Sequence, residues 1–220
     1  MLPAVLLLVT AQAPEIGPMP RVFDPFAKWE KDIAAIEKKL SANPPPAGGV
    51  LFVGSSSIVR WDLAKTFPGE DFCNVGFGGS TIPDCTHFAS RIVAPYHPAT
   101  IVFYAGDNDI AQGHKPMQVA SDFHDFVAAV RRNNPTCRIL FIPVKPSIAR
   151  WKLFGVQKEA NALVRAYCEK EMGLAYVDIV SAMLRADGTP DPELFVKDGL
   201  HMSPKGYEIW TAAVRKTLAK

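Results

Sequence analysis

The stretch Val50-Leu51-Phe52-Val53-Gly54-Ser55-Ser56-Ser57 joins four consecutive apolar residues to a glycine and three serines. Four further short apolar runs follow it along the chain. Because their residues are apolar consecutively instead of alternately, these runs are typical of parallel strands that are covered on both faces. The five predicted strands cover residues 50–53, 72–75, 100–105, 139–144 and 174–179.

Helical patterns separate these apolar runs. A proline follows a capping residue at Asp24-Pro25 and again at Ser203-Pro204, as at many helix starts. Apolar residues at helical spacing then predict helices over 26–40, 116–132, 156–172 and 204–218. The alternation of strands and helices predicts an α/β protein, a three-layer α/β/α sandwich with right-handed crossovers. We expect residues 21–220 to form a single domain.

The charge of the chain is nearly balanced. The 24 basic and 22 acidic residues give a formal net charge of +2. No run of Lys or Arg marks a surface for nucleic acid or for an anionic membrane. We therefore expect no nucleic-acid partner.

The N-terminal residues 1–20 are predicted to be a signal peptide or tail. An apolar stretch from Leu2 to Thr10 precedes Ala11-Gln12-Ala13, a small-x-small pattern suited to signal peptidase. The stretch is shorter than the ~20 apolar residues that span a bilayer, so we expect no transmembrane anchor. Export to the periplasm or the exterior is the prediction. Because no Lys or Arg precedes the stretch, the alternative is a cytoplasmic protein with a ragged N-terminus.

The four cysteines allow two interpretations. Cys73, Cys85, Cys137 and Cys168 would permit disulfides in an oxidising compartment, and three complete pairings are possible. Buried thiols that act as small hydrophobic side chains are the alternative. None of the four lies in a C-x-x-C pair, and their scatter does not resemble a zinc site.

Small and polar residues follow the predicted strands at one edge of the sheet. In an open parallel sheet, ligands bind beyond the carboxyl ends of the strands. The residues at these ends are 54–57, 76–80, 106–109 and 145–147, and they include several glycines and serines. The sequence therefore predicts a functional site at this edge.

The histidine that best fits nucleophilic catalysis is His201. A serine hydroxyl needs a neighbouring base, and the base must itself be oriented. Of the five histidines, His201 is the one in a loop before the last helix, where it follows an aspartate by three residues in Asp198-Gly199-Leu200-His201. Asp198 could then fix the tautomer of the imidazole. A hydrogen bond within the loop, without catalysis, is the alternative.

The glycine- and serine-rich turns also allow more than one interpretation. The GSSS turn is not a G-x-S-x-G elbow, because Ile58 stands where the second glycine would be, and it lacks the ending of a phosphate loop. A cluster that caps the next helix is the alternative. Gly78-Gly79 could aim an N–H at an oxyanion, or could form only a tight turn.

Asn108 is the fourth candidate, since its side-chain amide could donate a second hydrogen bond to an oxyanion. Its neighbours Asp107 and Asp109 do not make a coordination set by themselves, so we expect no metal there.

Together, and in this order, these segments resemble the sequence blocks of the SGNH hydrolase superfamily, the GDSL-like esterases and lipases. Residues 53–58 resemble the first block, with Ser56 as the nucleophile and Ser55 where many members have aspartate. Residues 74–80 resemble the second block, whose oxyanion glycine corresponds to Gly79. The remaining blocks correspond to 106–109, with Asn108 as the side-chain donor, and to 198–201, with Asp198 and His201.

The resemblance implies a five-stranded flavodoxin-like parallel sheet, no cofactor, and hydrolysis of short-chain acyl esters through an acyl-enzyme on Ser56. The oxyanion hole would comprise Ser56, Gly79 and Asn108. The substrate would be a small-molecule or sugar-borne ester, and the oligomeric state stays open. Alternatives within this chemistry are a carbohydrate O-acetyl esterase and a lysophospholipase.

From other classes, a non-catalytic binding module and a flavin-binding relative of flavodoxin share the sheet. Some aromatic side chains could line an acyl or sugar pocket, although core packing is the favoured interpretation. They are Trp61, Phe77, Trp151 and Phe154. His114 could reach the site, but we expect an exposed loop histidine.

Overall fold

The structure is a computed structural model and describes residues 24–220. The predicted signal peptide, residues 1–20, lies outside the described residues. Among those residues, no helix has the length and apolar character that crossing a membrane requires.

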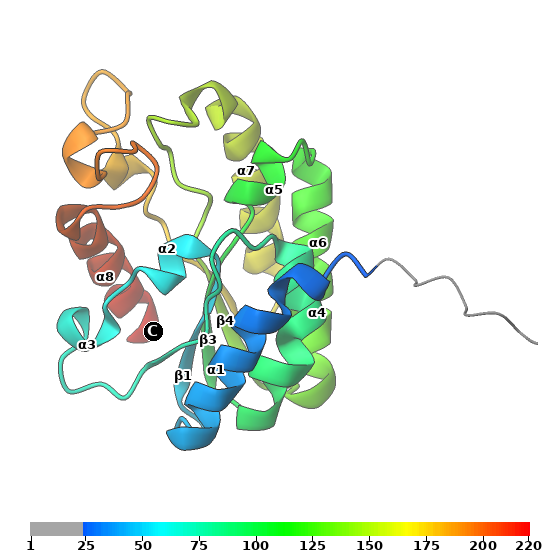
Figure 1. The fold of residues 1–220 in the computed structure, drawn as a ribbon. Coiled ribbons are helices and arrows are strands. Elements are labelled where there is room, and N and C mark those ends of the chain that lie inside the picture. The colour runs from blue at the N-terminus through cyan, green and yellow to red at the C-terminus, as the bar shows by residue number, and fades with distance from the viewer. Residues whose placement is uncertain (1–23) are drawn as a thin grey trace, which may run out of the picture.

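A parallel sheet of five strands forms the middle layer of the molecule (Figure 1). The strand order is β2-β1-β3-β4-β5, the order of the flavodoxin-like fold, and every pair is parallel. This confirms the predicted α/β/α architecture. The strands are β1 (Val50–Gly54), β2 (Cys73–Asn74), β3 (Thr100–Tyr104), β4 (Arg138–Phe141) and β5 (Leu174–Tyr176).

The edge strands are shorter than the sequence predicts. β2 has two residues instead of four, and β5 has three instead of six. Both have neighbours on one side only, and their residues are half-buried. Val177 and Ile179 are fully buried although they lie beyond β5. The apolar pattern therefore predicted the burial of Val177 and Ile179 correctly but overstated the length of the strand.

Consecutive residues of the central strands point into two separate cores. Leu51 and Val53 belong to one core, and Phe52 between them belongs to the other. In β3, Phe103 and Tyr104 are divided between the two cores in the same way. Because side chains alternate across a sheet, a strand buried on both faces must be apolar at every position. This explains the runs that define the fold.

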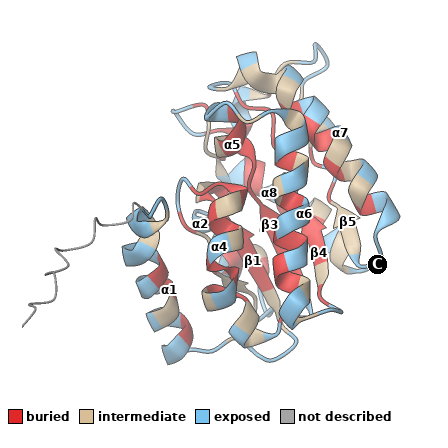
Figure 2. Cartoon of the chain, turned by 90° about the vertical axis from the view of Figure 1, so that its right-hand side faces the viewer, coloured by how far each residue is buried: buried red, intermediate tan, exposed pale blue. Residues whose placement is uncertain are grey.

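Helices cover both faces of the sheet (Figures 1 and 2). One layer contains four neighbouring helices that pack in sequence against one another. They are α1 (Glu30–Ala42), α4 (Ile82–Ile92), α6 (Pro116–Asn133) and α7 (Phe154–Lys170). The other face carries α3 (Leu63–Thr66) and α8 (Pro204–Leu218). Two short helices, α2 (Ser56–Val59) and α5 (Asp107–Ala111), follow directly after β1 and β3.

Local sequence explains where the last helix begins and which side it buries. The Ser203 side chain accepts a hydrogen bond from the Gly206 N–H, and Pro204 is the first residue of α8. Tyr207, Trp210 and Val214, at helical spacing, are buried against the sheet. The predicted start and inward face of this helix are both confirmed.

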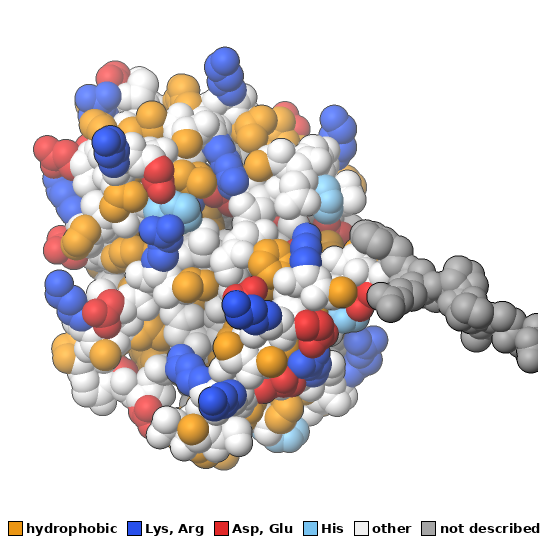
Figure 3. Space-filling model, in the orientation of Figure 1, with side chains coloured by type: hydrophobic (Ala, Val, Ile, Leu, Met, Phe, Trp, Pro, Cys, Tyr) orange, Lys and Arg blue, Asp and Glu red, His pale blue; other side chains and the backbone are white. Residues whose placement is uncertain are grey.

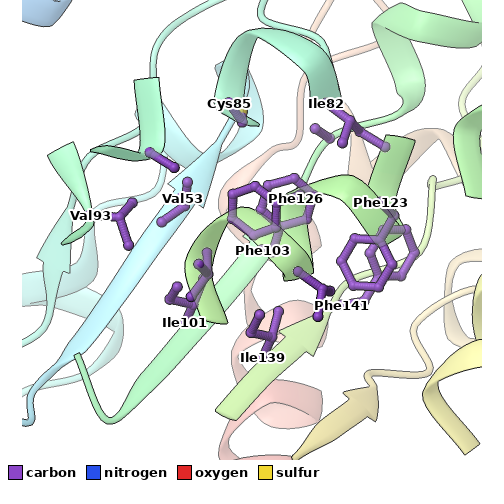
Figure 4. Close-up of a cluster of buried hydrophobic side chains, with 14 of the residues drawn as sticks. Val53, Ile82, Cys85, Val93, Ile101, Phe103, Phe123, Phe126, Ile139 and Phe141 are labelled. Carbon is purple, nitrogen blue, oxygen red and sulfur yellow. The ribbon is translucent and has the colours of Figure 1, made fainter. Parts of the chain in front are cut away.

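Aromatic side chains fill the core between the sheet and α6 (Figure 4). Phe103 of β3 stacks on Phe126 of α6 with ring centroids 4.1 Å apart, and Phe123 lies 4.7 Å from Phe141 of β4. Such pairs add about 0.5–1.5 kcal/mol beyond area burial. They fix α6 on the strands whose carboxyl ends carry the polar residues.

All four cysteines are free thiols, and three of them are buried. The structure thus agrees with the interpretation as small hydrophobic side chains. Burial raises the pKa of the Cys137 and Cys168 thiols to about 12, which leaves them protonated and unreactive at neutral pH.

Candidate active site

The backbone after β1 explains why a glycine precedes the serines. Gly54 ends the strand with φ +144°, and a Cβ placed on it would lie 1.9 Å from the carbonyl oxygen of Tyr104 in β3. Only glycine allows this close approach. The Ser55 N–H donates to the same carbonyl at 3.0 Å, and the chain turns so that Ser56 begins α2. Ser56 is half-buried at the carboxyl end of the sheet.

Ser56, His201 and Asp198 form a continuous chain of hydrogen bonds. The Ser56 Oγ lies 3.0 Å from His201 Nε2, although the two residues are 145 positions apart in the sequence. On the other side of the ring, His201 Nδ1 lies 2.7 Å from Asp198 Oδ2. The structure therefore brings together the three residues that the sequence singled out.

The loop that carries Asp198 orients the imidazole. Asp198 Oδ1 accepts hydrogen bonds from the N–H groups of Leu200 and His201, each at 2.9 Å. The bond from the His201 ring, followed by those from the two backbone amides, lowers the pKa of the Asp198 carboxyl well below its usual range. The carboxylate therefore stays charged at neutral pH. A charged acceptor holds the Nδ1–H tautomer and turns the Nε2 lone pair toward Ser56.

One backbone hydrogen bond ties this loop to the segment after β4, and another closes the loop on itself. The Ala149 N–H donates to the Gly199 carbonyl at 3.0 Å, and the Val196 N–H donates to the His201 carbonyl at 2.8 Å. These bonds limit the freedom of His201 relative to the strand ends.

Two backbone N–H groups beside Ser56 are free to receive a ligand. The turn after β2 is tied to β1 by a hydrogen bond from the Phe77 N–H to the Gly54 carbonyl, at 2.9 Å. Within this turn Gly79 has φ +86° and is exposed. Among the described residues, neither the Gly79 N–H nor the Ser56 N–H donates to a protein acceptor. The site thus offers unpaired donors where the sequence predicts an oxyanion hole.

Asn108 is held in one orientation by two partners. Its Nδ2 donates to the Ser80 carbonyl at 3.0 Å, and its Oδ1 accepts from Arg150 Nη2 at 3.0 Å. Only this orientation of the amide satisfies both contacts. One Nδ2 hydrogen remains for another acceptor, and the bond to Ser80 places Asn108 next to Gly79.

Arg150 is a residue of the site that the sequence analysis missed. Its Nη1 lies 2.7 Å from the buried carboxylate of Asp107, which also accepts from Lys145 Nζ at 3.0 Å. Tyr104 OH lies 3.3 Å from the same carboxylate. Burial acts to raise the pKa of Asp107, but the charges of Lys145 and Arg150 outweigh it, so that the pKa is lowered. The ion pair with Asp107 holds Arg150 in place, and Arg150 in turn orients the side chain of Asn108.

The other candidate residues are four aromatic residues and His114, and most of their side chains pack against the protein. Trp61 and Phe77 are each 2% exposed and belong to the two cores, as expected. Trp151 and Phe154 stack on each other at 4.6 Å and are half-buried. His114 is not an exposed loop residue: its side chain is 24% exposed and lies 3.2 Å from Asp122.

The surface around the site has no single sign of charge. On the face shown in Figure 3, Lys and Arg side chains alternate with Asp and Glu side chains. This distribution agrees with the small net charge and does not steer a strongly charged ligand.

Comparisons with known proteins agree with this fold. The sequence model of the GDSL-like Lipase/Acylhydrolase family matches residues 52–209. No curated protein matches the chain. Among solved structures, a GDSL-like lipase from Bacteroides thetaiotaomicron has a TM-score of 0.72 at 18% identity, covering 85% of this chain and 97% of its own.

Two esterases of carbohydrates share the fold as well. A carbohydrate esterase of family 3 from Talaromyces cellulolyticus has a TM-score of 0.59 at 16% identity, covering 78% of this chain and 96% of its own. A mutant of an acetyl-xylooligosaccharide esterase from Geobacillus has a TM-score of 0.63 at 15% identity, covering 80% of this chain and 96% of its own.

The fold and the family match define the protein as an ester hydrolase of the SGNH superfamily. Within that class, the chain belongs to the GDSL-like lipase/acylhydrolase family. This membership sets aside the binding module and the flavin-binding protein as alternatives.

Proposed function

We propose that the protein hydrolyses short-chain acyl esters, of the acetyl type, through an acyl-enzyme on Ser56. The observation that carries this proposal is the hydrogen-bonded chain from Ser56 through His201 to Asp198. A hydroxyl, an imidazole and a carboxylate in this order are the parts that nucleophilic acyl transfer needs.

In the first half of the reaction, His201 Nε2 takes the proton of Ser56 as the hydroxyl attacks the ester carbonyl. Asp198 stabilises the imidazolium that forms. The negative oxygen of the tetrahedral intermediate is held by the N–H groups of Ser56 and Gly79 and by the free Nδ2 hydrogen of Asn108. His201 then gives its proton to the leaving alcohol, and the acyl group stays on Ser56.

In the second half, water replaces the alcohol. His201 removes a proton from the water, which attacks the acyl-enzyme carbonyl, and the same donors hold the second oxyanion. Collapse of this intermediate returns the proton to Ser56 and releases the carboxylic acid. No cofactor takes part in this proposed sequence.

A carbohydrate O-acetyl esterase is the second candidate function. An open groove of about 580 Å³ lies beside the site, bounded by Val59 of α2 and by Gly78 next to Gly79. Carboxylates of Asp32 and Asp62 line it together with the aromatic ring of Phe72. Mixed polar and aromatic walls suit a sugar better than a long acyl chain. Two structural neighbours are named as carbohydrate or acetyl-xylooligosaccharide esterases, which supports the same substrate class.

A substrate panel tests the proposal. Purified protein would be assayed on p-nitrophenyl esters from acetate to long acyl chains, on acetylated xylan, and on a lysophospholipid. We expect the highest kcat/KM on the acetate ester, and release of acetate from xylan if the sugar candidate is correct. A preference for the lysophospholipid would contradict both, and no turnover of any ester would contradict the proposed site.

Asn108→Ala is expected to lower kcat by about 100-fold or more, because one oxyanion donor is lost, a loss of about 3 kcal/mol. The measurement is steady-state hydrolysis of p-nitrophenyl acetate. Asn133→Ala, at an exposed position near the end of α6, is the matched control and should retain activity. If Asn108→Ala keeps wild-type kcat and folds correctly, Asn108 is not an oxyanion donor.

Arg150→Met is expected to lower kcat about tenfold with little change in KM, because the amide of Asn108 loses the charged donor that orients it. The second ion pair of Asp107, with Lys145, should keep the fold intact. The exposed Arg132→Met is the control. A large rise in KM at constant kcat would show instead that Arg150 binds the substrate.

We also propose that residues 1–20 direct export. N-terminal sequencing of protein recovered outside the cytoplasm should give a mature start near Pro14. An intact Met1 on exported protein would contradict cleavage.

A further inference from the structure

Outside the Ser56 site, the structure brings together Asp109 of α5, His114 of the following loop and Asp122 of α6. One carboxylate oxygen from each aspartate and one ring nitrogen of His114 all lie within 4.8 Å of one another. We propose that these three side chains bind a divalent transition metal ion, with Zn²⁺ as the best-fitting ion.

An unpaired buried oxygen points to a missing ligand. Asp109 is fully buried. Its Oδ1 accepts the Ile82 N–H at 2.9 Å, but its Oδ2 is buried and has no partner among the described residues. Buried carboxylate oxygens are costly unless they are hydrogen-bonded, paired or bound to a metal. The backbone bond from the His114 N–H to the Asp109 carbonyl, at 3.0 Å, holds the histidine next to this oxygen.

The charges at the cluster favour a cation. Two carboxylates face a single imidazole. No Lys or Arg side chain in the described residues forms an ion pair with either aspartate. A doubly charged ion would supply the charge that the protein does not.

The donor set fits zinc better than calcium. Two ligands about 2.0–2.1 Å from a tetrahedral Zn²⁺ lie about 3.3 Å apart, and His114 Nδ1 and Asp122 Oδ2 are 3.2 Å apart. The carboxylate of Asp109 lies within 4.8 Å of both atoms and would be the third ligand, and water would fill the fourth position. Calcium takes six to eight oxygen ligands, and an imidazole nitrogen suits zinc.

The sequence alone does not predict this site, because its three residues are not neighbours in the chain. Asp107 and Asp109 do not form a coordination set with each other, because they point in different directions: Asp107 toward Lys145, Asp109 toward His114. A metal at Asp109, His114 and Asp122 would tie α5 to α6. Its role would be structural, one residue away from Asn108.

Zinc titration of the full-length protein tests the proposal. After treatment with EDTA and its removal, isothermal titration with ZnCl₂ should show one site, and Ca²⁺ should bind far more weakly. His114→Gln and Asp122→Asn should each weaken Zn²⁺ binding by about tenfold or more. His124→Gln is the matched control, because His124 forms an exposed pair with Asp125 on the same helix, at 3.6 Å, and it should bind as the wild type does.

A second measurement does not depend on the variants folding. Co²⁺ added to the wild-type protein should give visible absorption bands of a low-coordinate site, and Zn²⁺ should displace them. The proposal is overturned if the wild-type protein binds neither ion, or if His114→Gln and His124→Gln bind Zn²⁺ equally. In that case the cluster is a His–Asp hydrogen bond only.

Discussion

Ser56→Ala is expected to lower kcat/KM for p-nitrophenyl acetate by about 10,000-fold or more while the protein stays folded. The hydroxyl that His201 faces at 3.0 Å is the only group of the proposed mechanism that forms the covalent bond to the acyl carbon. Without it, the remaining donors can only assist water, which leaves about 1,000- to 10,000-fold catalysis over the uncatalysed rate in serine hydrolases. The measurement is steady-state hydrolysis, checked by circular dichroism for folding.

The flanking serines provide the control. Ser57 is as small as Ser56 and is buried beside it, but its contact to α8 is through the backbone carbonyl, which accepts from Tyr207 OH at 2.8 Å. Ser57→Ala should therefore keep activity within a few-fold. A fluorophosphonate should add its mass to the wild type and to Ser57→Ala, but not to Ser56→Ala. Labelling that survives in Ser56→Ala would place the nucleophile elsewhere.

The sequence predicted the fold because burial on both faces leaves a pattern in the residues themselves. Phe52, between Leu51 and Val53, is apolar because a second helical layer covers it. Strand length at the sheet edges was not predictable in this way. β5 ends at Tyr176, yet the Val177 N–H still donates to the Phe141 carbonyl of β4 at 2.9 Å, and Val177 and Ile179 are buried beyond the end of the strand. An apolar run indicates contact with a core, but it does not indicate where the hydrogen-bond ladder of the strand ends.

Part of the site was equally predictable. Gly54 and Gly79 have positive φ angles that favour glycine, so the residue type itself indicates these turns. Asp198 and His201 are only three residues apart, so their contact could be expected from the spacing. Arg150 was not predictable, since it reaches Asn108 from a loop 42 residues away. Asp107 and Asp109 point in different directions because of the side-chain packing around α5. The run Gly106-Asp107-Asn108-Asp109 does not predict these directions.

His201→Ala is expected to lower kcat/KM by about 10,000-fold or more, as Ser56→Ala does, because the hydroxyl is a weak nucleophile without a base. The stronger test is the double variant. If Ser56 and His201 act as one unit, the rate of Ser56→Ala/His201→Ala should lie within a few-fold of either single variant, since the second change removes a partner that has already lost its function.

The exposed His124→Ala serves as the control for loss of an imidazole and should leave kcat/KM unchanged. Stability should change little in His201→Ala, because Asp198 is nearly half exposed and keeps its bonds to the backbone amides of Leu200 and His201. Additive losses in the double variant would mean that serine and histidine contribute to separate steps. The 3.0 Å contact between them would then be only a structural hydrogen bond that holds the 198–201 loop on the sheet edge.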